Sequence, residues 1–423
     1  MSKQPAYDCV VVGAGAVGAT LALALAQQDR RVALVDGRPG PTEAPGAEHG
    51  EFVVSLNLAS VALLSNLGVW APLQAGRLSP YTAMELWDSA GAGHTRFDSA
   101  DIGEPVLGYF VEVAWLESVL HQALAAHPQV TLFWGHRANA LDIDADRVRL
   151  QVEGAQPVEA ALAAAADGAR SHLRELAGID VTSYDYGQRA LVCNFATEAS
   201  HGAVARQRFL PGGPVAMLPL SDGRCSLAWF RPEAEAERLL ALDEASFCAE
   251  LSAATKHRLG AVTAATRRRA YPIVRRHADQ YVAERVALVG DAAHTIHPQA
   301  GQGLNIGLLD VAALADAVGV RGDPGARRGL RRYARWRRGH NAAVMAAMDF
   351  FHFGFAQGGP VRALARNLGM RLADRSGPAK RWVTRSGCGL SEDTPPLARH
   401  PAAGLRHADA AAAPLGTRHG DPL

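Results

Sequence analysis

The chain has 423 residues, of which 48% are hydrophobic and 20% are charged. This is the composition of a globular protein, and the length predicts about two to three domains. A formal net charge of +1 gives no field that would attract nucleic acid, and five scattered cysteines without a CxxC pair indicate reduced thiols, as in a cytoplasmic protein.

Residues 7–38 predict a strand, a glycine-rich turn, a helix and a second strand, which together make one βαβ unit. Both strands are short, apolar and continuous, as expected for parallel strands buried on both faces. The uncharged stretch 9–28 also has the length of a transmembrane helix, about 20 residues. Three glycines interrupt it and its first half has a β-branched strand pattern, so we prefer the βαβ interpretation.

The turn of this unit, GAGAVG, has the G-x-G-x-x-G spacing of a dinucleotide-binding site. Gly13 permits the tight turn, Gly15 lets the backbone approach a pyrophosphate, and Gly18 allows the helix to pack closely on the strand. Asp36 ends the second strand, where an acid accepts hydrogen bonds from ribose hydroxyls. The motif does not separate NAD from FAD. The residues expected to bind the dinucleotide here are Gly13, Gly15, Ala16, Val17, Gly18, Asp36, Gly37 and Arg38.

The middle of the chain changes from an α/β pattern to an antiparallel one. One helix is predicted within residues 56–70 and ends at Gly68. A second is predicted over 114–127 and ends before Pro128. Strand-like segments cover 82–88, 94–98, 130–135 and 146–153. From about 186 to 271 strands follow one another through hairpin turns, with one helix over 243–258. This predicts an antiparallel sheet inserted into the α/β domain.

A second strand-to-helix turn occurs at residues 285–310, RVALVGDAAHTIHPQAGQGLNIGLLD. Gly290 would let the backbone approach a ligand, and Asp291 is an acceptor suited to a hydroxyl group, such as one on a ribityl chain. The helix that follows would stabilise negative charge on a reduced flavin at its N-terminus. An extended FAD needs both turns, whereas NAD needs only the first. The residues expected to hold the flavin are Gly290, Asp291, Pro298, Gly301, Gly303, Leu304 and Asn305.

A third turn, ADGARS, contains Asp167 and Gly168 after a predicted strand. It fits the neighbourhood of the nucleotide and equally fits a surface turn. His294 and His297 are three residues apart, but a metal needs three or four ligands, so no metal site is predicted. We expect His294 to support the loop by hydrogen bonding. His297 is expected to face the site, as a general base or as a structural residue.

The three turns occur in the same order in the aromatic-ring flavoprotein hydroxylases similar to p-hydroxybenzoate hydroxylase. The stretch VGDAAHTIHPQAGQGLNIGLLDVAAL resembles the branch that acts in ubiquinone biosynthesis, and LGMRLADRSGPAKRWVTRSGCGL resembles the C-terminal region of its 2-polyprenylphenol hydroxylases. The resemblance covers roughly residues 5–392. It implies a Rossmann-like FAD-binding domain, an inserted antiparallel-sheet substrate domain and a C-terminal helical region.

The resemblance also implies an activity. NAD(P)H reduces FAD, dioxygen forms a C4a-hydroperoxyflavin, and the distal oxygen passes to the ring of a polyprenylated phenol, with Pro298 and His297 beside the reactive edge. The FAD-binding domain is expected at 1–75, 113–182 and 273–330, the substrate domain at 76–112 and 183–272, the C-terminal helices at 331–392 and a disordered tail at 393–423.

Four residues depart from the family pattern. Phe52 stands where an arginine near the flavin or its phosphates is expected, Val113 and Ala114 replace a polar pair, and Asp36 replaces a more frequent glutamate. These changes leave open a second interpretation, a catalytically impaired accessory subunit of a quinone-biosynthesis complex. A flavin enzyme of the same fold with other chemistry, such as halogenation or alkene reduction, is a third.

The C-terminal region combines a basic group with the aromatic run FFHFGF at 350–355. A solvated helix face and a core helix would explain both. Contact with an anionic membrane, at the inner membrane in this family, or with a partner complex would explain them equally well. The basic residues are Arg327, Arg328, Arg331, Arg332, Arg335, Arg337 and Arg338.

Overall fold

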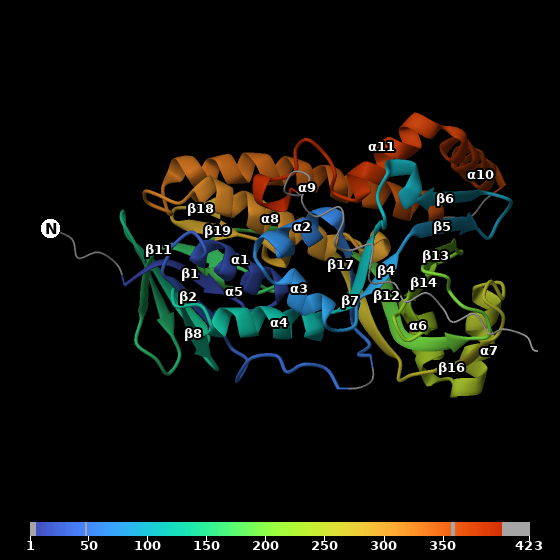
Figure 1. Cartoon of the computed structure of the whole chain (residues 1–423), viewed down its shortest axis with the longest axis horizontal. Coiled ribbons are helices and arrows are strands. Elements are labelled where there is room, and N and C mark those ends of the chain that lie inside the picture. Colours follow the sequence, from blue (N-terminus) through green and yellow to red (C-terminus); the bar gives the residue numbers. More distant parts are fainter. Residues whose placement is uncertain (1–5, 47–48, 357–359, 400–423) are drawn as a thin grey trace, which may run out of the picture.

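The computed structural model describes residues 6–46, 49–356 and 360–399. It contains a parallel sheet at one end and an antiparallel sheet at the other, and a long helix lies along both (Figure 1). A smaller third sheet lies between them.

The first sheet is the expected Rossmann-like sheet. Its central strands pair in parallel, because each βαβ crossover returns the chain in the same direction. Its strands in spatial order are β18 (Val282–Ala283), β19 (Val286–Leu288), β11 (Val158–Ala165), β1 (Tyr7–Val12), β2 (Val32–Asp36) and β8 (Val130–Trp134), with β10 (Val148–Val152) and β9 (Ala138–Ile143) added as a hairpin on β11.

The second sheet is antiparallel except for one parallel pair, formed by β13 and β5. Its strands in order are β20 (His294–Thr295), β17 (Arg269–Ala278), β12 (Val181–Thr197), β15 (Cys225–Pro232), β14 (Val215–Pro219), β13 (Val204–Phe209), β5 (Ala83–Asp88) and β6 (His94–Asp98), and β16 (Val262–Ala265) pairs with β12. The third sheet has the order β3 (Val53–Asn57), β7 (Gly108–Glu112) and β4 (Ser79–Tyr81).

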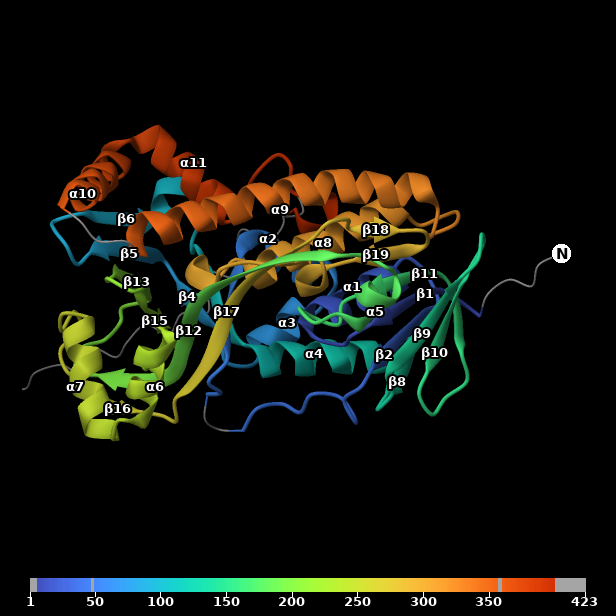
Figure 2. The ribbon, with the colours of Figure 1, turned by 180° about the vertical axis from the view of Figure 1, so that it is seen from behind.

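The helices pack on these sheets, and the last three helices lie along one side of the molecule (Figure 2). They are α1 (Ala16–Ala26), α2 (Leu58–Asn66), α3 (Trp70–Gln74), α4 (Val113–Ala125), α5 (His172–Leu176), α6 (Glu233–Ala241), α7 (Glu244–Ala254), α8 (Gly303–Val318), α9 (Arg327–Ala356), α10 (Pro360–Arg375) and α11 (Gly377–Gly387).

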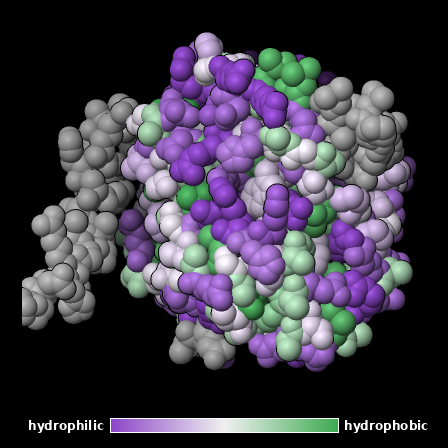
Figure 3. Space-filling model, turned by 90° about the vertical axis from the view of Figure 1, so that its right-hand side faces the viewer, coloured by the Kyte–Doolittle hydropathy of each residue, from purple (hydrophilic) through white to green (hydrophobic). Residues whose placement is uncertain are grey.

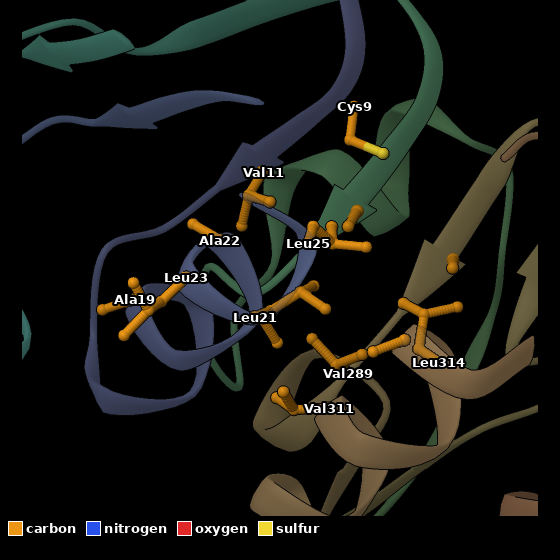
Figure 4. Close-up of a cluster of buried hydrophobic side chains, with 14 of the residues drawn as sticks. Cys9, Val11, Ala19, Leu21, Ala22, Leu23, Leu25, Val289, Val311 and Leu314 are labelled. Atoms are coloured by element: carbon orange, nitrogen blue, oxygen red, sulfur yellow. The ribbon is translucent and has the colours of Figure 1, made fainter. Parts of the chain in front are cut away.

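The main core lies where α1 packs between the first sheet and α8 (Figure 4). Helix α1 is apolar on all sides and nearly all of it is buried, as expected for a helix enclosed by protein. Leu21 and Leu25 of α1 lie close to Val289 and to Val311 and Leu314 of α8. The segment 9–28 therefore forms β1 and α1. In the described part of the chain no helix is both long and apolar enough to span a bilayer.

The structure differs from the expected domain boundaries at two points. The boundaries at 182 and 272 fall inside β12 and β17, which pair along most of their length as one continuous ribbon. Both boundaries therefore lie within paired strands of the second sheet, and neither falls in a linker. The single helix expected over 243–258 is the shorter α7, and a second helix, α6, precedes it.

The expected disordered tail begins later than predicted. Residues 393–399 are described, and a 3₁₀ turn at Pro396–Ala398 packs on α2 and α8. Asn66 donates hydrogen bonds to the carbonyls of Leu397 and Arg399, which fixes this segment. The prediction of disorder was wrong for these seven residues, since Ala398 is buried in the main core. The rest of the predicted tail, 400–423, lies outside the described residues.

Candidate active site

The first glycine turn joins β1 to α1 with almost no free space. Gly13 has φ +100°, and a Cβ on it would stand 2.4 Å from the carbonyl oxygen of Ala166. A Cβ on Gly18 would lie 1.9 Å from the carbonyl oxygen of Gly13. A Cβ on Gly15 would meet only Glu117 Oε1, at 3.5 Å. Gly13 and Gly18 therefore make the turn, and Gly15 presents open backbone at the uncapped N-terminus of α1, where N–H groups remain for a phosphate.

Asp36 is held beside this turn at the end of β2. Its carboxylate accepts a 2.6 Å hydrogen bond from the amide of Ala14 and further bonds from Arg38. Arg38 also donates to Glu117 Oε2 at 2.8 Å. Desolvation acts to raise the pKa of Asp36, but these hydrogen bonds outweigh it and the pKa is lowered. Asp36 is thus an ionised acceptor beside the first glycine turn.

His121, which sequence reasoning missed, braces the same turn from α4. Its Nδ1 accepts a hydrogen bond from the amide of Thr42 at 2.9 Å, so Nε2 carries the proton and donates to the carbonyl of Ala14 at 2.7 Å. The side chain is buried, and burial lowers the pKa of His121. It stays a neutral link between the glycine turn and the loop after β2.

The second turn follows β19, as the sequence predicts. Gly290 has φ +58°, and the adjacent Asp291 directs its carboxyl into a cavity. The surrounding protein raises the pKa of Asp291 by desolvation. His294 Nε2 lies 2.5 Å from Asp310 Oδ2 on α8, which confirms that His294 supports the loop by hydrogen bonding.

Asp310 is the centre of a fully buried network. Arg337 of α9 contacts Asp310 Oδ1 through Nε at 2.7 Å, and Asn341 donates to the same oxygen at 3.0 Å. Desolvation acts to raise the pKa of Asp310, but the charges and hydrogen bonds of His294 and Arg337 hold it well below its usual range. Helix α9 therefore holds the second turn in place through the buried ion pair between Arg337 and Asp310.

The N-terminus of α8 presents free backbone amides. Gly301 has φ +61°, nothing lies within 4 Å of a Cβ built on Gly303, and no side chain caps the helix. Asn305 is fully buried: its Nδ2 donates to the carbonyls of Ser55 at 2.8 Å and Gly301 at 3.0 Å, and its Oδ1 accepts from Ser60 Oγ at 2.7 Å. Asn305 thus shapes the loop instead of offering its amide to a ligand.

One cavity of about 600 Å³ joins the three turns. It extends from the N-terminus of α1, past the N-terminus of α8, to the inner face of the second sheet. Nine of the predicted cofactor residues line it: Gly15, Ala16, Val17, Gly168, Asp291, Pro298, Gly301, Gly303 and Leu304.

The other eight predicted cofactor residues do not line the cavity. Gly13, Gly18 and Gly290 shape turns. Asp167 accepts hydrogen bonds from the amides of His172 and Leu173 and so caps α5. The remaining four, Asp36, Gly37, Arg38 and Asn305, are outside the set that lines the cavity.

His297 does not face the cavity, contrary to expectation. The backbone there is extended, so its side chain points away from the side that Pro298 occupies. The imidazole is 1% exposed and packs against Tyr186, Phe230 and His352, with Nε2 3.4 Å from Gln188 Oε1. Burial, followed by the nearby His352, lowers the pKa of His297 to about 3. This environment favours a structural role over that of a general base.

Three cavity residues were missed by the sequence analysis. Thr295 Oγ1 and Gln299 Oε1 are buried, line the cavity and have no hydrogen-bond partner in the described part of the chain. Arg276 also lines the cavity, and its charge acts on the Asp291 carboxyl. Buried polar atoms need partners, so these groups and the free amides of two helix N-termini fit a large polar cofactor such as FAD. The sequence signal for Thr295 and Gln299 is their position beside the second turn, and Arg276 has no such signal.

Phe52, the main departure from the family pattern, lies in the cavity wall. It is 51% exposed and its ring makes an edge contact with Tyr271, at 5.4 Å between centroids. Val113, the second departure, begins α4 and also lines the cavity. Both residues are uncharged, so neither supplies a positive charge at this part of the cavity wall.

Replacing Phe52 with arginine is expected to strengthen FAD binding about fivefold, since a partly exposed ion pair with a phosphate contributes roughly 1 kcal/mol. Titration of the apoprotein with FAD at low and high salt measures this, and the gain should shrink at high salt. The matched control is Phe350→Arg, because Phe350 is exposed and outside the cavity. An equal gain in both variants would show a general charge effect.

The comparisons with known proteins agree with this geometry. The family model described as an FAD binding domain matches residues 6–348. A 3-demethoxyubiquinol 3-hydroxylase of Escherichia coli (strain K12) is 40% identical over 395 residues, which cover 92% of this chain and 100% of that protein. The ubiquinone hydroxylase UbiL of Rhodospirillum rubrum is 37% identical, over 94% of each chain. The chain belongs to the FAD-dependent hydroxylases of ubiquinone biosynthesis.

This family membership makes the chain a flavoprotein monooxygenase with FAD as cofactor, as the sequence predicted. NAD(P)H is the reductant typical of these enzymes. Solved structures show the same fold at lower identity. The p-nitrophenol 4-monooxygenase PnpA of Pseudomonas putida DLL-E4 superposes with a TM-score of 0.75 at 21% identity, covering 91% of this chain and 98% of its own. A point variant of HpxO of Klebsiella pneumoniae, solved with FAD, has a TM-score of 0.72 at 20% identity, covering 90% and 98%.

Proposed function

We propose that the protein hydroxylates the aromatic ring of a polyprenylated phenol in ubiquinone biosynthesis. The observation that carries this proposal is the single cavity that joins the FAD turns to the second sheet. On the sheet side its walls are mostly apolar, as a ring with a hydrocarbon tail requires. The apolar residues of the second sheet there are Met84, Val192, Leu218, Leu227, Ala228, Phe230 and Ile273, and Phe110 of the third sheet adds to them.

The names of the relatives support the substrate class. The relative from Escherichia coli is named for hydroxylation of demethoxyubiquinol, and mitochondrial relatives are named ubiquinone biosynthesis monooxygenases, such as the 31% identical COQ6 of Xenopus tropicalis. A demethoxyubiquinol is a polyprenylated ring of the kind that the apolar half of the cavity would accept.

The chain's own residues would bind and orient. The amides at the start of α1 would hold the pyrophosphate, and those at the start of α8 would stabilise negative charge on the flavin ring. Asp291 would accept a hydroxyl of the ribityl chain. Pro298 and the apolar sheet residues would exclude water from the reacting face.

Bound FAD, once reduced by NAD(P)H, would supply the activation of dioxygen at its C4a position that the family resemblance implies. The protein would contribute the position of the ring relative to that edge. His297 would contribute by packing behind Pro298, since its low pKa does not suit proton transfer near neutral pH.

The test is a turnover assay with purified protein, FAD, NAD(P)H and a demethoxy polyprenylphenol under ¹⁸O₂. The expected product carries one added oxygen atom that is labelled. A folded protein that binds no FAD, and that oxidises no NAD(P)H when the phenol is supplied, would overturn the proposal and favour the accessory-subunit interpretation.

Ala228→Phe is expected to lower kcat/KM for the prenylated phenol at least about tenfold, since the larger ring fills cavity space that the substrate needs. FAD binding, read from the visible spectrum, should stay unchanged because Ala228 lies on the sheet side. The matched control is Ala196→Phe on the same sheet, outside the cavity wall. Equal turnover in both variants would place the substrate elsewhere.

A further inference from the structure

Helices α10 and α11 form a corner of the molecule beside the second sheet (Figures 1 and 2). Helix α10 packs on β6, and α11 packs on α10 and on the 3₁₀ turn Ser99–Ile102. Lys380 anchors α11 through ion pairs to Asp101 and Asp374, at 3.7 and 3.3 Å. The inner sides of both helices are therefore fixed on the protein.

The outer side of this corner exposes large apolar side chains. Leu368 and Leu372 are 56% and 59% exposed and lie on one face of α10, because they are four residues apart. Trp382 and Val383 of α11 are 70% and 46% exposed. Figure 3, which views this end of the molecule, shows an apolar patch at its upper edge with hydrophilic side chains beside it. Four such residues on two adjacent helices are unusual for a surface in contact only with water.

The same segment is strongly basic. Residues 360–387 contain seven arginine or lysine residues and one aspartate, a net charge of +6. The whole chain has a net charge of +1, so the remainder carries −5. Among the described side chains Arg371, Arg375, Arg381 and Arg385 are exposed. A positive charge of this size around apolar residues is complementary to an anionic surface.

The basic group at the start of α9, which the sequence singled out, is less suited to such a surface. Arg337 is buried in the ion pair with Asp310, and Arg332 forms an ion pair with Asp316 of α8. These two charges serve helix packing. The exposed phenylalanines of α9, Phe350, Phe351 and Phe353, are twelve or more residues beyond its arginines, whereas exposed arginines and exposed apolar residues occur together within residues 368–385 of α10 and α11.

We propose that the outer face of α10 and α11 binds the headgroup layer of an anionic lipid bilayer. Trp382, Val383, Leu368 and Leu372 enter the boundary between headgroups and acyl chains, and the arginines contact lipid phosphates. Helix α10 packs on β6, the neighbour of β5, and Met84 of β5 lines the cavity. The bilayer thus lies beside the substrate sheet. A bilayer at this position would also give a membrane-resident substrate a route to the cavity, and this part of the proposal rests on the proposed function. Lipid binding itself does not rest on it.

The test is co-sedimentation of the full-length FAD-bound protein with vesicles. Phosphatidylcholine vesicles with about a quarter phosphatidylglycerol should bind it, and pure phosphatidylcholine vesicles should bind it far less. Arg381→Gln with Arg385→Gln should weaken binding about thirtyfold, and Leu372→Ser with Trp382→Ser by a similar factor. Matched controls are Arg328→Gln with Arg331→Gln for charge and Val320→Ser for an exposed apolar residue elsewhere.

The outcomes separate this proposal from the proposed function. Hydroxylation of a detergent-dispersed, short-chain substrate by the α10–α11 variants should equal that of the unchanged protein. No binding to anionic vesicles, or equal losses in test and control variants, would overturn the proposal. So would self-association of the unchanged protein that Leu372→Ser with Trp382→Ser abolishes while vesicle binding persists, because the patch would then be a protein interface.

Discussion

Gly15→Ala is expected to yield a folded but colourless protein. A Cβ at this position meets no backbone, and its only near neighbour is Glu117 Oε1 at 3.5 Å, so the apoprotein should fold. The methyl group would project into the cavity where the pyrophosphate approaches the start of α1. Loss of two charge-assisted hydrogen bonds, each worth about 1.5 kcal/mol, predicts FAD affinity at least about a hundredfold lower.

Titration of the apoprotein with FAD, followed by flavin fluorescence, measures this loss, and circular dichroism checks the fold. Gly40→Ala is the matched control, since nothing lies within 4 Å of its Cβ position and it is outside the cavity. Gly18→Ala should behave differently: its Cβ would stand 1.9 Å from the Gly13 carbonyl oxygen, so the fold itself should suffer. Normal FAD binding by Gly15→Ala would contradict the placement of the pyrophosphate.

Arg337→Leu is expected to destabilise the protein by about 3–5 kcal/mol, because it leaves the buried Asp310 carboxylate without its cationic partner. The apparent Tm should fall by about 3–6 °C, since the unfolding entropy of a chain of this length is roughly 0.9 kcal/mol/K. FAD should also bind more weakly, since Asp310 accepts hydrogen bonds from the Gly290 amide and from His294 in the second turn. Thermal unfolding of the apoprotein and FAD titration measure the two effects.

Arg338→Leu is the matched control, because it removes an exposed arginine one residue further along α9. Asp310→Asn combined with Arg337→Leu should recover part of the loss, since no unpaired charge then remains in the core. If Arg337→Leu and Arg338→Leu have equal Tm values, the ion pair does not hold the second turn.

The same carboxylate predicts an acid dependence. Its pKa is lowered in the folded state, so its contribution to stability is complete above the unfolded value of about 4 and is lost as pH falls toward the folded value. The difference in Tm between the unchanged protein and Asp310→Asn should therefore shrink as pH is lowered from about 5 to about 3. A difference that stays constant over this range would mean that Asp310 is not ionised in the fold.

Local sequence patterns were sufficient to predict the elements whose conformation has a local cause. Two short apolar strands and the G-x-G-x-x-G spacing predict the βαβ unit of residues 7–38. In the structure β1, α1 and β2 form this unit. The turn at Gly290–Asp291 and the helix after it are also where the pattern places them. Family resemblance, carried by three ordered motifs, indicated the FAD-dependent hydroxylase. His294 was identified as a loop support, although not its partner.

Which residues face the cavity and which support its walls depends on contacts between elements that are distant in the sequence. Asp310, Arg337 and His121 act across many residues of chain, so no local pattern marks them. His297 points away because the extended backbone sends adjacent side chains to opposite sides, a direction that composition does not encode. Arg337 and Arg381 look alike in sequence, yet one is buried by its ion pair and the other exposed at a corner. Spacing along the chain fixes local conformation, whereas packing between distant elements fixes burial, and burial determines what a charged or titratable side chain can do.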